Sequence, residues 1–222
     1  MTNHSIQIKG DVKKFYDQNA SLYLESTQHP FELRLHYFRK LVARLPAANA
    51  SILELGCGAG VPCTQFLAQH ERLKIVANDI SETQIVLARK RLPPSVKLLH
   101  GDMTGLQFPP NTFDAVSAIY TVFHLPRDEQ IIMLQRIYDW LKSGGFLLVT
   151  FSPHEVIGEY ATSYLGGAAT RLFWSGWGPE KTREILMEIG FHLELDEIMA
   201  DMEAGRDGRV ESPYHWVLAR KL

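Results

Sequence analysis

The residues of this chain best suited to binding a ligand gather in one short segment, 52–60, which reads Ile-Leu-Glu-Leu-Gly-Cys-Gly-Ala-Gly. An apolar run carries the acid Glu54, and three glycines follow at every second position. Because glycine has no Cβ, such a loop lets a ligand lie against backbone N–H groups. Pro62 comes next, where a proline suits the first turn of a helix. The segment predicts a buried strand, a glycine loop and a helix, which together open a nucleotide-binding type of α/β fold.

The spacing of the glycines narrows the choice of nucleotide. Dinucleotide-binding loops read G-x-G-x-x-G, whereas this loop reads G-x-G-x-G and has Val61 where their third glycine would stand. This departure counts against NAD and FAD, whose pyrophosphate sits on the helix N-terminus. Glu54 instead favours a ligand with a cationic end. The plain alternative is a tight strand-to-helix turn that binds nothing.

Two further acids follow the next two predicted strands. Asp79 comes 19 residues after Gly60, and loops at the carboxyl ends of parallel strands line the ligand crevice of open α/β sheets. Its carboxylate can accept hydrogen bonds from both hydroxyls of a ribose; the alternative is a helix cap, for which Ser81 is better placed. Asp102 can accept a hydrogen bond from an adenine amino group, while Met103 offers a backbone N–H and a soft apolar surface.

The loop after the fourth predicted strand, 119–126, carries the candidate catalytic groups. It contains Tyr120 and His124, and His124 is the candidate for a base or for a group that orients the acceptor. A packing histidine is the plain alternative. The two cysteines, Cys57 and Cys63, flank the glycine loop. We expect reduced thiols, with Cys57 as a small residue beside the ligand rather than a nucleophile.

Strands and helices alternate through most of the chain, as in a parallel α/β sheet. We expect strands at 51–55, 74–77, 96–99, 113–119, 146–151, 191–198 and 214–220. We expect helices at 12–25, 31–45, 63–70, 82–92 with Ser81 as its N-cap, 128–141 ended by Gly144 and Gly145, and 179–189. Segment 154–178 is rich in aromatics and glycines without a clear period, and 203–213 reads as a polar turn.

Composition and charge describe one globular domain with no sign of a nucleic-acid or membrane partner, while a protein substrate stays open. Hydrophobic residues make up 45% of the 222 residues, and the net charge of −2 gives no sign of nucleic acid or a membrane surface. No stretch approaches the roughly 20 apolar residues of a membrane span, and the first ten residues lack the apolar core of a signal peptide. We expect a cytoplasmic protein of open oligomeric state, with a single domain 1–222 divided into a helical cap 1–48, a cofactor-binding core 49–151, a substrate-side insertion 152–178 and C-terminal helix and strands 179–222.

The motifs and their order resemble those of a known family. They are segment 52–60, Asn78-Asp79-Ile80-Ser81, Gly101-Asp102-Met103, Phe113-Asp114-Ala115-Val116, His124 and Leu141-Lys142-Ser143-Gly144-Gly145. Over most of its length the chain resembles the class I S-adenosylmethionine-dependent methyltransferases, in particular their small-molecule branch of the ubiquinone-biosynthesis type. The resemblance implies a Rossmann-like seven-stranded sheet, mostly parallel with an antiparallel last strand, helices on both faces and an N-terminal helical cap. It also implies S-adenosylmethionine as cofactor, S-adenosylhomocysteine as product and a small-molecule methyl acceptor.

The resemblance further implies which residues contact the cofactor, namely Glu54, Gly56, Gly58, Asp79, Ile80, Asp102, Met103 and Ile119. In this branch the N-terminal helix lies over the cofactor. Tyr16 and Tyr23 are seven residues apart and share a helical face there, although simple packing on the domain explains them equally well. We expect this segment to be a mobile cap that the cofactor orders. Lys142-Ser143 departs from the common Arg/Lys-Pro before the Gly-Gly turn, which the two glycines tolerate.

Methyl transfer mainly requires in-line alignment of an acceptor atom with the methyl carbon, and it needs a base only when the acceptor must lose a proton. No metal-ligand spacing is visible in the sequence. We expect the acceptor pocket to come from Tyr120, His124 and the aromatic segment that holds Tyr160, Tyr164 and Trp174, which can equally form that segment's own core. Two alternatives stay open: an NAD(P)-binding Rossmann oxidoreductase, and a catalytically idle module that only binds the cofactor.

Overall fold

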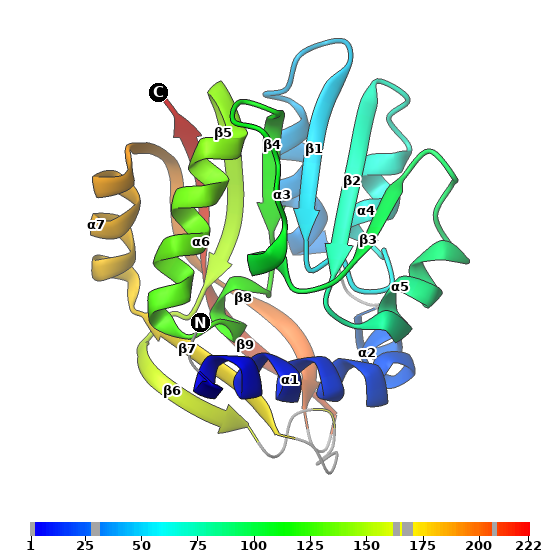
Figure 1. Ribbon diagram of the computed structural model, residues 1–222, viewed down its shortest axis with the longest axis vertical. Helices are drawn as coiled ribbons and strands as arrows, with labels where there is room; N and C mark the ends of the chain where they lie inside the picture. Colours follow the sequence, from blue (N-terminus) through cyan, green and yellow to red (C-terminus); the bar gives the residue numbers. More distant parts are fainter. Residues whose placement is uncertain (1–2, 28–31, 162–164, 166–170, 206–207) are drawn as a thin grey trace.

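A seven-stranded sheet in the order β3-β2-β1-β4-β5-β9-β8 forms the centre of the protein, with helices on both faces (Figure 1). The computed structural model describes residues 3–27, 32–161, 165, 171–205 and 208–222. The strands are β1 (Ala50–Leu55), β2 (Leu73–Asp79), β3 (Lys97–His100), β4 (Phe113–Ala118), β5 (Leu141–Phe151), β8 (Phe191–Gly205) and β9 (Gly208–Lys221). β1 to β5 pair in parallel, and β9 runs antiparallel to both β5 and β8. The predicted fold class, including the antiparallel last strand, is confirmed.

The central strands explain why their sequences are apolar without alternation. β1 and β4 are buried along nearly their whole length, because helices cover both faces of a parallel sheet. The parallel register pairs Leu55 with Asn78 and Asp79 with His100. The loops after β1, β2 and β3 therefore meet at one edge of the sheet, where the acids predicted from the sequence lie.

Two layers of helices pack on the sheet, each around its own apolar core. On one face the core includes Tyr37, Phe38 and Leu41 of α3, together with residues of α4 and α5. On the other face it includes residues of α6 and α7. The helices are α1 (Asn3–Gln18), α2 (Ala20–Thr27), α3 (Glu32–Val42), α4 (Cys63–Ala68), α5 (Glu82–Arg89), α6 (Arg127–Trp140) and α7 (Pro179–Ile189), with short 3-10 helices η1 (Met103–Gly105) and η2 (Val122–His124).

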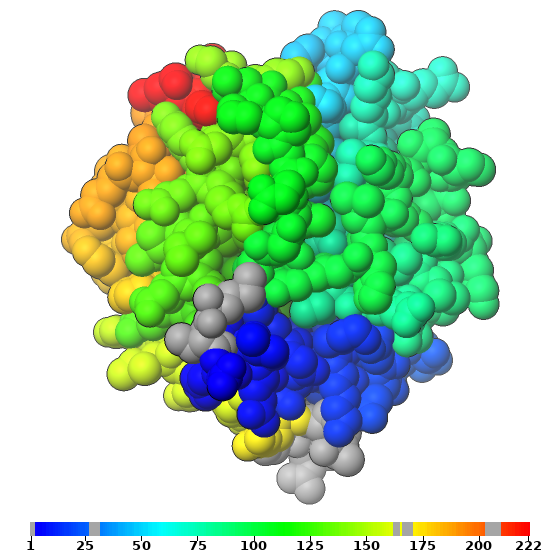
Figure 2. Space-filling model, in the orientation of Figure 1, coloured from blue at the N-terminus to red at the C-terminus, as the bar shows by residue number. Residues whose placement is uncertain are grey.

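The N-terminal helices lie across the carboxyl ends of the strands. In Figure 1 the arrows of β1, β2 and β5 point toward α1, and in Figure 2 the blue residues of α1 and α2 cover that end of the molecule. Beside α1 lies a two-stranded antiparallel sheet of β6 (Glu155–Ala161) and β7 (Leu172–Trp177). A third apolar core joins the two, with Ile8, Val12 and Phe15 of α1 against Leu172 and Phe173 of β7.

Three elements differ from the sequence prediction. The N-terminal helix predicted at 12–25 is two helices, α1 and α2, separated at Asn19. Segment 154–178, predicted to have no period, contains β6 and β7, whose pairing shifts register between Val156 and Glu159 and so hides the two-residue alternation. The polar turn predicted at 203–213 is wrong, because β8 continues to Gly205 and β9 starts at Gly208.

The junction between α6 and β5 also differs. The helix predicted to be stopped by Gly144 and Gly145 ends earlier, at Trp140, and β5 begins at Leu141. The pairing of β5 with β4 shifts register just past Leu141, and the two glycines lie in this irregular part of the strand. By contrast α7 has the predicted bounds, with Pro179 at its start and Gly190 in the left-handed conformation at its end. None of the helices in the described ranges is long and apolar enough to cross a membrane.

Candidate active site

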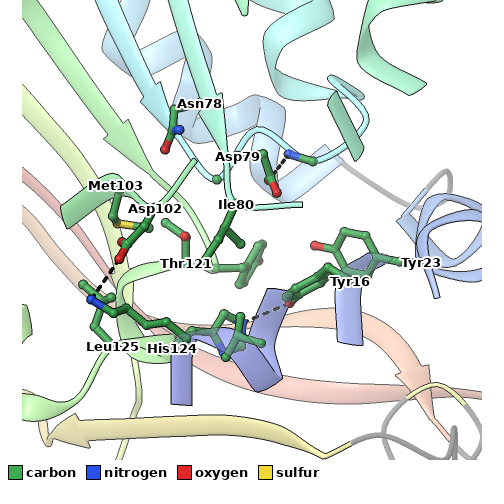
Figure 3. A pocket seen from close by; sticks show the side chains of 15 residues that line it. Tyr16, Tyr23, Asn78, Asp79, Ile80, Asp102, Met103, Thr121, His124 and Leu125 are labelled. Atoms are coloured by element: carbon green, nitrogen blue, oxygen red, sulfur yellow. Dashed lines mark hydrogen bonds and ion pairs between the residues drawn. The ribbon is translucent and has the colours of Figure 1, made fainter. Parts of the chain in front are cut away.

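Three cavities share lining side chains near the carboxyl ends of the central strands. The acidic cavity, of about 50 Å³, is lined by Asp79 and Asp102 among others (Figure 3). The mixed-charge cavity, of about 40 Å³, is lined by Glu54 and Arg34. The aromatic cavity, of about 520 Å³, is lined mainly by rings. Tyr23 and Tyr120 line all three cavities, so the three hollows converge on these two side chains.

The glycine loop is tight because of its own packing. Gly56 has φ +71°, and a Cβ there would lie 2.5 Å from the Thr121 hydroxyl oxygen, so only glycine fits. The N–H groups of Gly56 and Cys57 both donate to the carbonyl of Asn78, at 2.8 and 2.9 Å. These N–H groups are therefore used inside the protein, which differs from the expectation that the ligand would lie against them. The glycines instead allow a close approach of backbone, neighbouring side chains and ligand.

Asp79 holds the loop from the end of β2. Its Oδ2 accepts from the Gly58 N–H at 2.8 Å and its Oδ1 from the Ser81 N–H at 2.9 Å. Ser81 in turn accepts from the Gln84 N–H and caps α5, as predicted. Burial raises the pKa of Asp79 to about 6, because a desolvated carboxylate is disfavoured. Additional donors, such as ribose hydroxyls, would lower that pKa and stabilise the ionised form.

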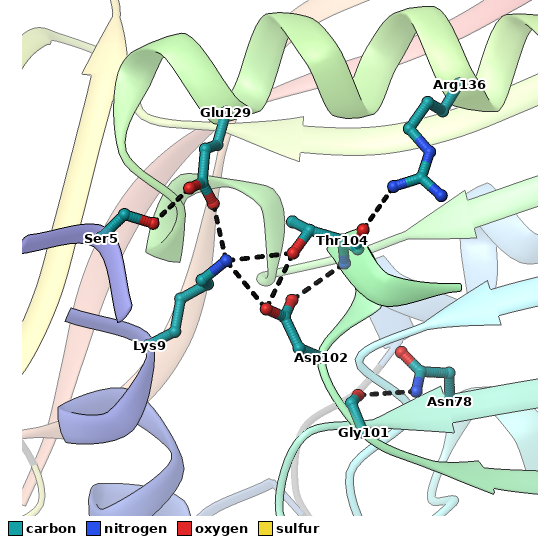
Figure 4. A network of polar contacts seen from close by, with 8 residues as sticks. All are labelled: Ser5, Lys9, Asn78, Gly101, Asp102, Thr104, Glu129 and Arg136. Atoms are coloured by element: carbon teal, nitrogen blue, oxygen red, sulfur yellow. Dashed lines mark hydrogen bonds and ion pairs between the residues drawn. The ribbon is translucent and has the colours of Figure 1, made fainter. Parts of the chain in front are cut away.

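Asp102 is already engaged by the N-terminal helix (Figure 4). Lys9 of α1 forms ion pairs with Asp102, at 2.8 Å, and with Glu129 of α6, at 3.0 Å. The same ammonium group donates to the Thr104 hydroxyl at 3.0 Å, and Thr104 donates to both oxygens of Asp102. Ser5 of α1 also contacts Glu129. This network ties α1 to the carboxylate for which the sequence predicts an adenine contact.

Glu54 is buried at the carboxyl end of β1, and its Oε2 has no hydrogen-bond partner among the described residues. Burial raises the pKa of Glu54 to about 7, and the negative charge of Asp79 adds to this effect. The Thr64 hydroxyl lies close enough to lower that pKa in part, but it does not meet the geometry of a hydrogen bond. A cationic group beside Glu54 would satisfy the carboxylate and restore its charge.

Arg34 lines the mixed-charge cavity from α3. Its Nε donates to Asp201 of β8 at 2.8 Å, and the Tyr120 hydroxyl donates to the same carboxylate oxygen at 2.7 Å. The guanidinium also lies over the Tyr120 ring, 4.6 Å from its centroid. Arg34 and Asp201 are both buried, at 7% and 4% exposure. A cation and the anion Glu54 thus line the same cavity.

His124 separates the acidic cavity from the aromatic one and lines both. Its Nδ1 lies 2.7 Å from the Phe173 carbonyl oxygen, which can only accept, so Nδ1 carries the hydrogen. Nε2 then accepts from the Tyr16 hydroxyl at 3.0 Å (Figure 3). Burial lowers the pKa of His124 to about 4. The imidazole is therefore neutral near pH 7, which favours orientation of an acceptor over the role of a strong base.

The aromatic cavity collects side chains from five segments of the chain. Its rings come from Tyr16, Tyr23, Tyr120, Phe123, Trp174 and Tyr214. Of the residues predicted to bind the acceptor, Trp174 lines this cavity. Tyr160 lies instead against the third apolar core and donates to Asp11 at 3.4 Å. Tyr164 lies outside the described residues.

The predicted cofactor residues converge on the two small cavities. The acidic cavity is lined by Tyr16, Tyr23, Gly56, Gly58, Asp79, Ile80, Asp102 and Met103, and the mixed-charge cavity by Glu54, Cys57 and Ile119 together with Tyr23 and both glycines. Burial raises the pKa of the Cys57 thiol well above its ordinary value, and the charges of Asp79 and Glu54 add to this. A thiol that stays protonated is a poor nucleophile, in agreement with the expected packing role.

Sequence reasoning missed Lys9, Arg34 and Asp201. Arg34 had a usable signal, because it shares a helical face with the buried Tyr37, Phe38 and Leu41. An arginine in such an apolar stripe must find a partner or a ligand. Lys9 and Asp201 had no local signal, since their partners are distant in the sequence.

Known proteins similar to this chain agree with the geometry. A family model described as "Methyltransferase domain" matches residues 52–145. The chain is 34% identical over 171 residues to a sterol 24-C-methyltransferase from Neurospora crassa, covering 70% of this chain and 41% of that protein. It is 31% identical over 136 residues to (S)-coclaurine N-methyltransferase from Thalictrum flavum, covering 55% and 37%. The chain thus spans less than half the length of these two relatives.

The fold has close counterparts among solved structures. Magnesium protoporphyrin IX methyltransferase from Synechocystis, crystallised with bound S-adenosylhomocysteine, superposes with a TM-score of 0.70 at 16% identity, covering 97% of this chain and 100% of that one. Residues 52–145 therefore match a methyltransferase domain, as the motifs predicted, and the fold is that of S-adenosylmethionine-dependent methyltransferases. In the Synechocystis structure this fold binds S-adenosylhomocysteine, the product of S-adenosylmethionine. The residues fit such a group, because Glu54 presents a buried, unpartnered carboxylate oxygen, within the described part of the chain, to a cationic amino-acid end.

Proposed function

We propose that the protein transfers the methyl group of S-adenosylmethionine to a small, apolar acceptor that carries no negative charge. One observation carries this proposal. Two small polar cavities and one large aromatic cavity share Tyr23 and Tyr120 in their linings, and Tyr16 and His124 line both the acidic and the aromatic cavity. Cofactor and acceptor would therefore occupy neighbouring cavities. Their reacting atoms would meet beside the rings that the cavities share.

Each of the two small cavities suits a different part of the cofactor. Asp79 would accept from the ribose hydroxyls, Asp102 and Met103 would border the adenine, and Glu54 would face the amino group of the methionine end. When bound, the cofactor supplies a methyl group already activated by its sulfonium leaving group. Both cavities have room for only a few water molecules as they stand. Binding therefore requires some of the lining side chains to move. We expect those of α1 to move, since α1 does not belong to the sheet.

The contribution of the protein to the reaction is positioning and exclusion of water. Tyr120 is held rigidly, since its N–H donates to the Thr150 hydroxyl and its own hydroxyl to Asp201, both at 2.7 Å. His124 is held by the Phe173 carbonyl, and its Nε2 can accept a hydrogen bond from the acceptor in place of Tyr16. A neutral, weakly basic imidazole would orient an acceptor that donates a hydrogen bond.

The lining of the aromatic cavity supports the class of acceptor. Its volume of about 520 Å³ lies within the range of small-molecule sites. The charged side chains among its described lining residues are two acids, Glu155 and Glu159, and neither lysine nor arginine is among them. An anionic acceptor would meet no compensating charge there, whereas a neutral ring system or an amine fits. The relatives named for sterol and coclaurine methylation carry acceptors of these two kinds in their names.

The test uses the full chain, methyl-labelled S-adenosylmethionine and a metabolite extract, followed by mass analysis of what gains the label. We expect the label in neutral or amine-bearing apolar compounds, with formation of S-adenosylhomocysteine. Trp174→Ala, at a residue that lines the aromatic cavity and neither of the two small ones, should keep cofactor affinity and lose transfer. Asp79→Ala should lose at least about 1–3 kcal/mol of cofactor affinity, because two ribose hydroxyls lose their partner.

Each alternative function predicts a different result in this experiment or in a thermal-stability measurement with each cofactor. Cofactor binding without any labelled product would identify an idle binding module. Thermal stabilisation by NADH but not by S-adenosylmethionine would identify an oxidoreductase. Label found mainly in carboxylates or phosphates would contradict the proposed acceptor class while leaving the methyltransferase activity standing.

A further inference from the structure

The small sheet of β6 and β7 contains two cross-strand pairs of the same composition, each a glutamate opposite a tryptophan. Glu155 of β6 lies opposite Trp177 of β7, and Glu159 lies opposite Trp174. Residues directly opposite each other in an antiparallel pair have neighbouring side chains on one face of the sheet. Each pair therefore places a carboxylate next to an indole ring.

The first pair binds a cation of the protein itself. Nη2 of Arg127, in α6, lies 2.6 Å from Oε1 of Glu155, and the guanidinium lies 4.2 Å from the centroid of the Trp177 ring. The Arg127 Nε also donates to the Gly176 carbonyl at 3.0 Å. A cation is attracted to both partners, because a carboxylate and the face of an aromatic ring are both negative. This pair thus shows which kind of group such a glutamate and tryptophan hold between them.

The second pair lines the aromatic cavity and neither of the two small cavities. In the described part of the chain, Glu159 forms no hydrogen bond and no ion pair. Arg171, next to the first residue of β7, lies instead over the Tyr160 ring, 4.5 Å from its centroid, and does not line the cavity. A cation at the pair of Glu159 and Trp174 would therefore come from a ligand in the cavity.

The remaining lining of the aromatic cavity suits an apolar body attached to that cation. The Tyr214 ring lies edge-on to Tyr120, with 4.6 Å between centroids, and stacks with Phe123 at 5.8 Å. The acids among the described lining residues are Glu155 and Glu159, with no lysine or arginine beside them. Because Glu155 already has its ion pair, the charge that a ligand meets in this cavity is that of Glu159.

The position of the pair separates the cation from the methyl group. Tyr16 and His124 line both the acidic and the aromatic cavity, whereas Glu159 and Trp174 line the aromatic cavity alone. An ammonium group at the pair therefore lies in the part of the cavity that the cofactor cavities do not share. An ammonium group also has no lone pair, so it cannot take a methyl group. The reacting atom must belong to a second group of the acceptor, at the end near His124.

We propose that the methyl acceptor is an apolar compound with an ammonium group, and that Glu159 and Trp174 select it by binding that ammonium. The inference rests on the proposed function and narrows it, because a neutral ring system is then a poor acceptor. A second group of the same compound receives the methyl beside Tyr120 and His124. The lone pair of its receiving atom forms the new bond to carbon, the electrons of the broken carbon–sulfur bond stay on sulfur, and a proton on that atom is released to solvent.

The test compares two probes of nearly equal shape: phenethyltrimethylammonium and the neutral isostere in which carbon replaces the quaternary nitrogen. A quaternary nitrogen neither titrates nor accepts a methyl group, so binding alone is measured. The full chain is first saturated with S-adenosylhomocysteine, which occupies the mixed-charge cavity and keeps the cation away from Glu54. Calorimetric titration then gives both dissociation constants. We expect the wild type to bind the cation at least about fivefold more tightly than the isostere.

Two substitutions that remove the same charge separate the pair from the general charge of the cavity. Glu159→Gln should weaken binding of the cation by at least about fivefold and that of the isostere by less than about twofold. Glu155→Gln acts on the pair that already holds Arg127, and it should change the ratio of the two constants by less than about twofold. Trp174→Leu keeps an apolar side chain without the indole face, so it should weaken the cation more than the isostere.

Each result bears on the inference. Equal losses in Glu159→Gln and Glu155→Gln would overturn it, since general negative potential would then attract the cation, and so would a wild type that binds both probes equally. Labelled products from the metabolite extract that lack a basic nitrogen would contradict it and leave the methyltransferase activity standing. A chain that does not bind S-adenosylhomocysteine would refute the proposed function itself. Support comes from a preference that only the substitutions of Glu159 and Trp174 abolish, together with labelled products that a cation exchanger retains at pH 7.

Discussion

The two ends of the candidate cofactor cleft each contain a buried cation paired with a carboxylate, but the two cations belong to different parts of the fold. Lys9 comes from α1, which lies across the mouth of the cleft, and it bridges Asp102 and Glu129. Arg34 comes from α3, which packs on the sheet, and it pairs with Asp201. We therefore expect Lys9 to move whenever α1 moves, whereas Arg34 is fixed by the packing of α3 on the sheet.

The acids that pair with the two cations also differ in burial. The side chain of Asp102 is 28% exposed, while that of Asp201 is 4% exposed. α1 itself rests on the small core that it shares with β7. Because α1 packs on this separate core, we expect the cleft to open at the acidic cavity, where Lys9 forms its ion pairs, and not at Arg34. A ligand would then reach Asp102 by displacing Lys9 and would find Arg34 already in place.

The largest expected effect is the difference in unfolding free energy between variants of Asp201 and Asp102. Asp201→Ala leaves the Arg34 guanidinium buried without its counter-ion, and we expect a loss of about 3–5 kcal/mol of unfolding free energy. Asp102→Ala leaves Lys9 paired with Glu129, and we expect a loss of about 1 kcal/mol. Urea denaturation of both variants, followed by tryptophan fluorescence, measures the difference. Equal losses would remove the distinction between a fixed and a detachable end.

Much of the fold follows from local patterns in the sequence. The bounds of α7 were predicted because Pro179 and Gly190 mark both of its ends. Ser81 was identified as the cap of α5 from its side chain and position. The extension of β8 and β9 was not predictable in the same way. Residues 203–213 are mostly polar, and the strand conformation of 203–205 and 208–213 depends on the pairing of β8 with β9 rather than on apolar alternation.

The candidate site also contains residues that local patterns predict and residues that they do not. Asp79, Asp102 and Glu54 were predictable because each follows or ends a strand at the edge where parallel strands meet. The contacts that complete these acids were not predictable. Lys9 reaches Asp102 across 93 positions of the sequence, and Arg34 reaches Asp201 across 167. Such pairs form only once tertiary packing has brought together elements that no local pattern relates.

The second prediction uses pH to separate the two ends. Burial raises the pKa of Glu54 to about 7 and that of Asp79 to about 6. Each acid therefore binds its proton more tightly when folded, so its contribution to stability falls as pH rises from the ordinary carboxyl pKa to the raised one. A ligand ammonium needs ionised Glu54. Affinity for S-adenosylhomocysteine should then rise by up to about tenfold per pH unit and level off near pH 7.

A smaller ligand gives the control for this pH profile. 5′-Methylthioadenosine lacks the amino-acid end and should depend on Asp79 alone, so its affinity should level off near pH 6. Glu54→Gln should shift the profile of S-adenosylhomocysteine to match it. Calorimetric titrations from pH 5 to 8 test both statements, and coincident profiles for the two ligands in the wild type would contradict the assignment of Glu54 to the ammonium.

The smallest expected effect concerns how firmly the ion pairs of Lys9 anchor α1 to the rest of the protein. Lys9→Met keeps an apolar stem of similar length but removes both ion pairs, each worth up to about 1 kcal/mol. Amide hydrogens of α1 should then exchange about fivefold faster, because local opening becomes easier, while those of α3 should not change. Lys13→Met is the matched control on the same helix, since Lys13 is 40% exposed and, among the described residues, forms an ion pair only with Asp17 one turn away.

Adding S-adenosylhomocysteine completes this test, because the sequence predicts that the N-terminal segment is a cap ordered by the cofactor. If Lys9 merely anchors α1, the ligand should restore slow exchange over residues 11–25 in Lys9→Met as well as in the wild type, through contacts with Tyr16 and Tyr23, which line the acidic cavity. Equal exchange with and without ligand would show that this helix is not a cap. Faster exchange in α3 to the same degree as in α1 would show that the two ends of the cleft open together, and the two ends would then differ only in the burial of their acids, Asp102 and Asp201.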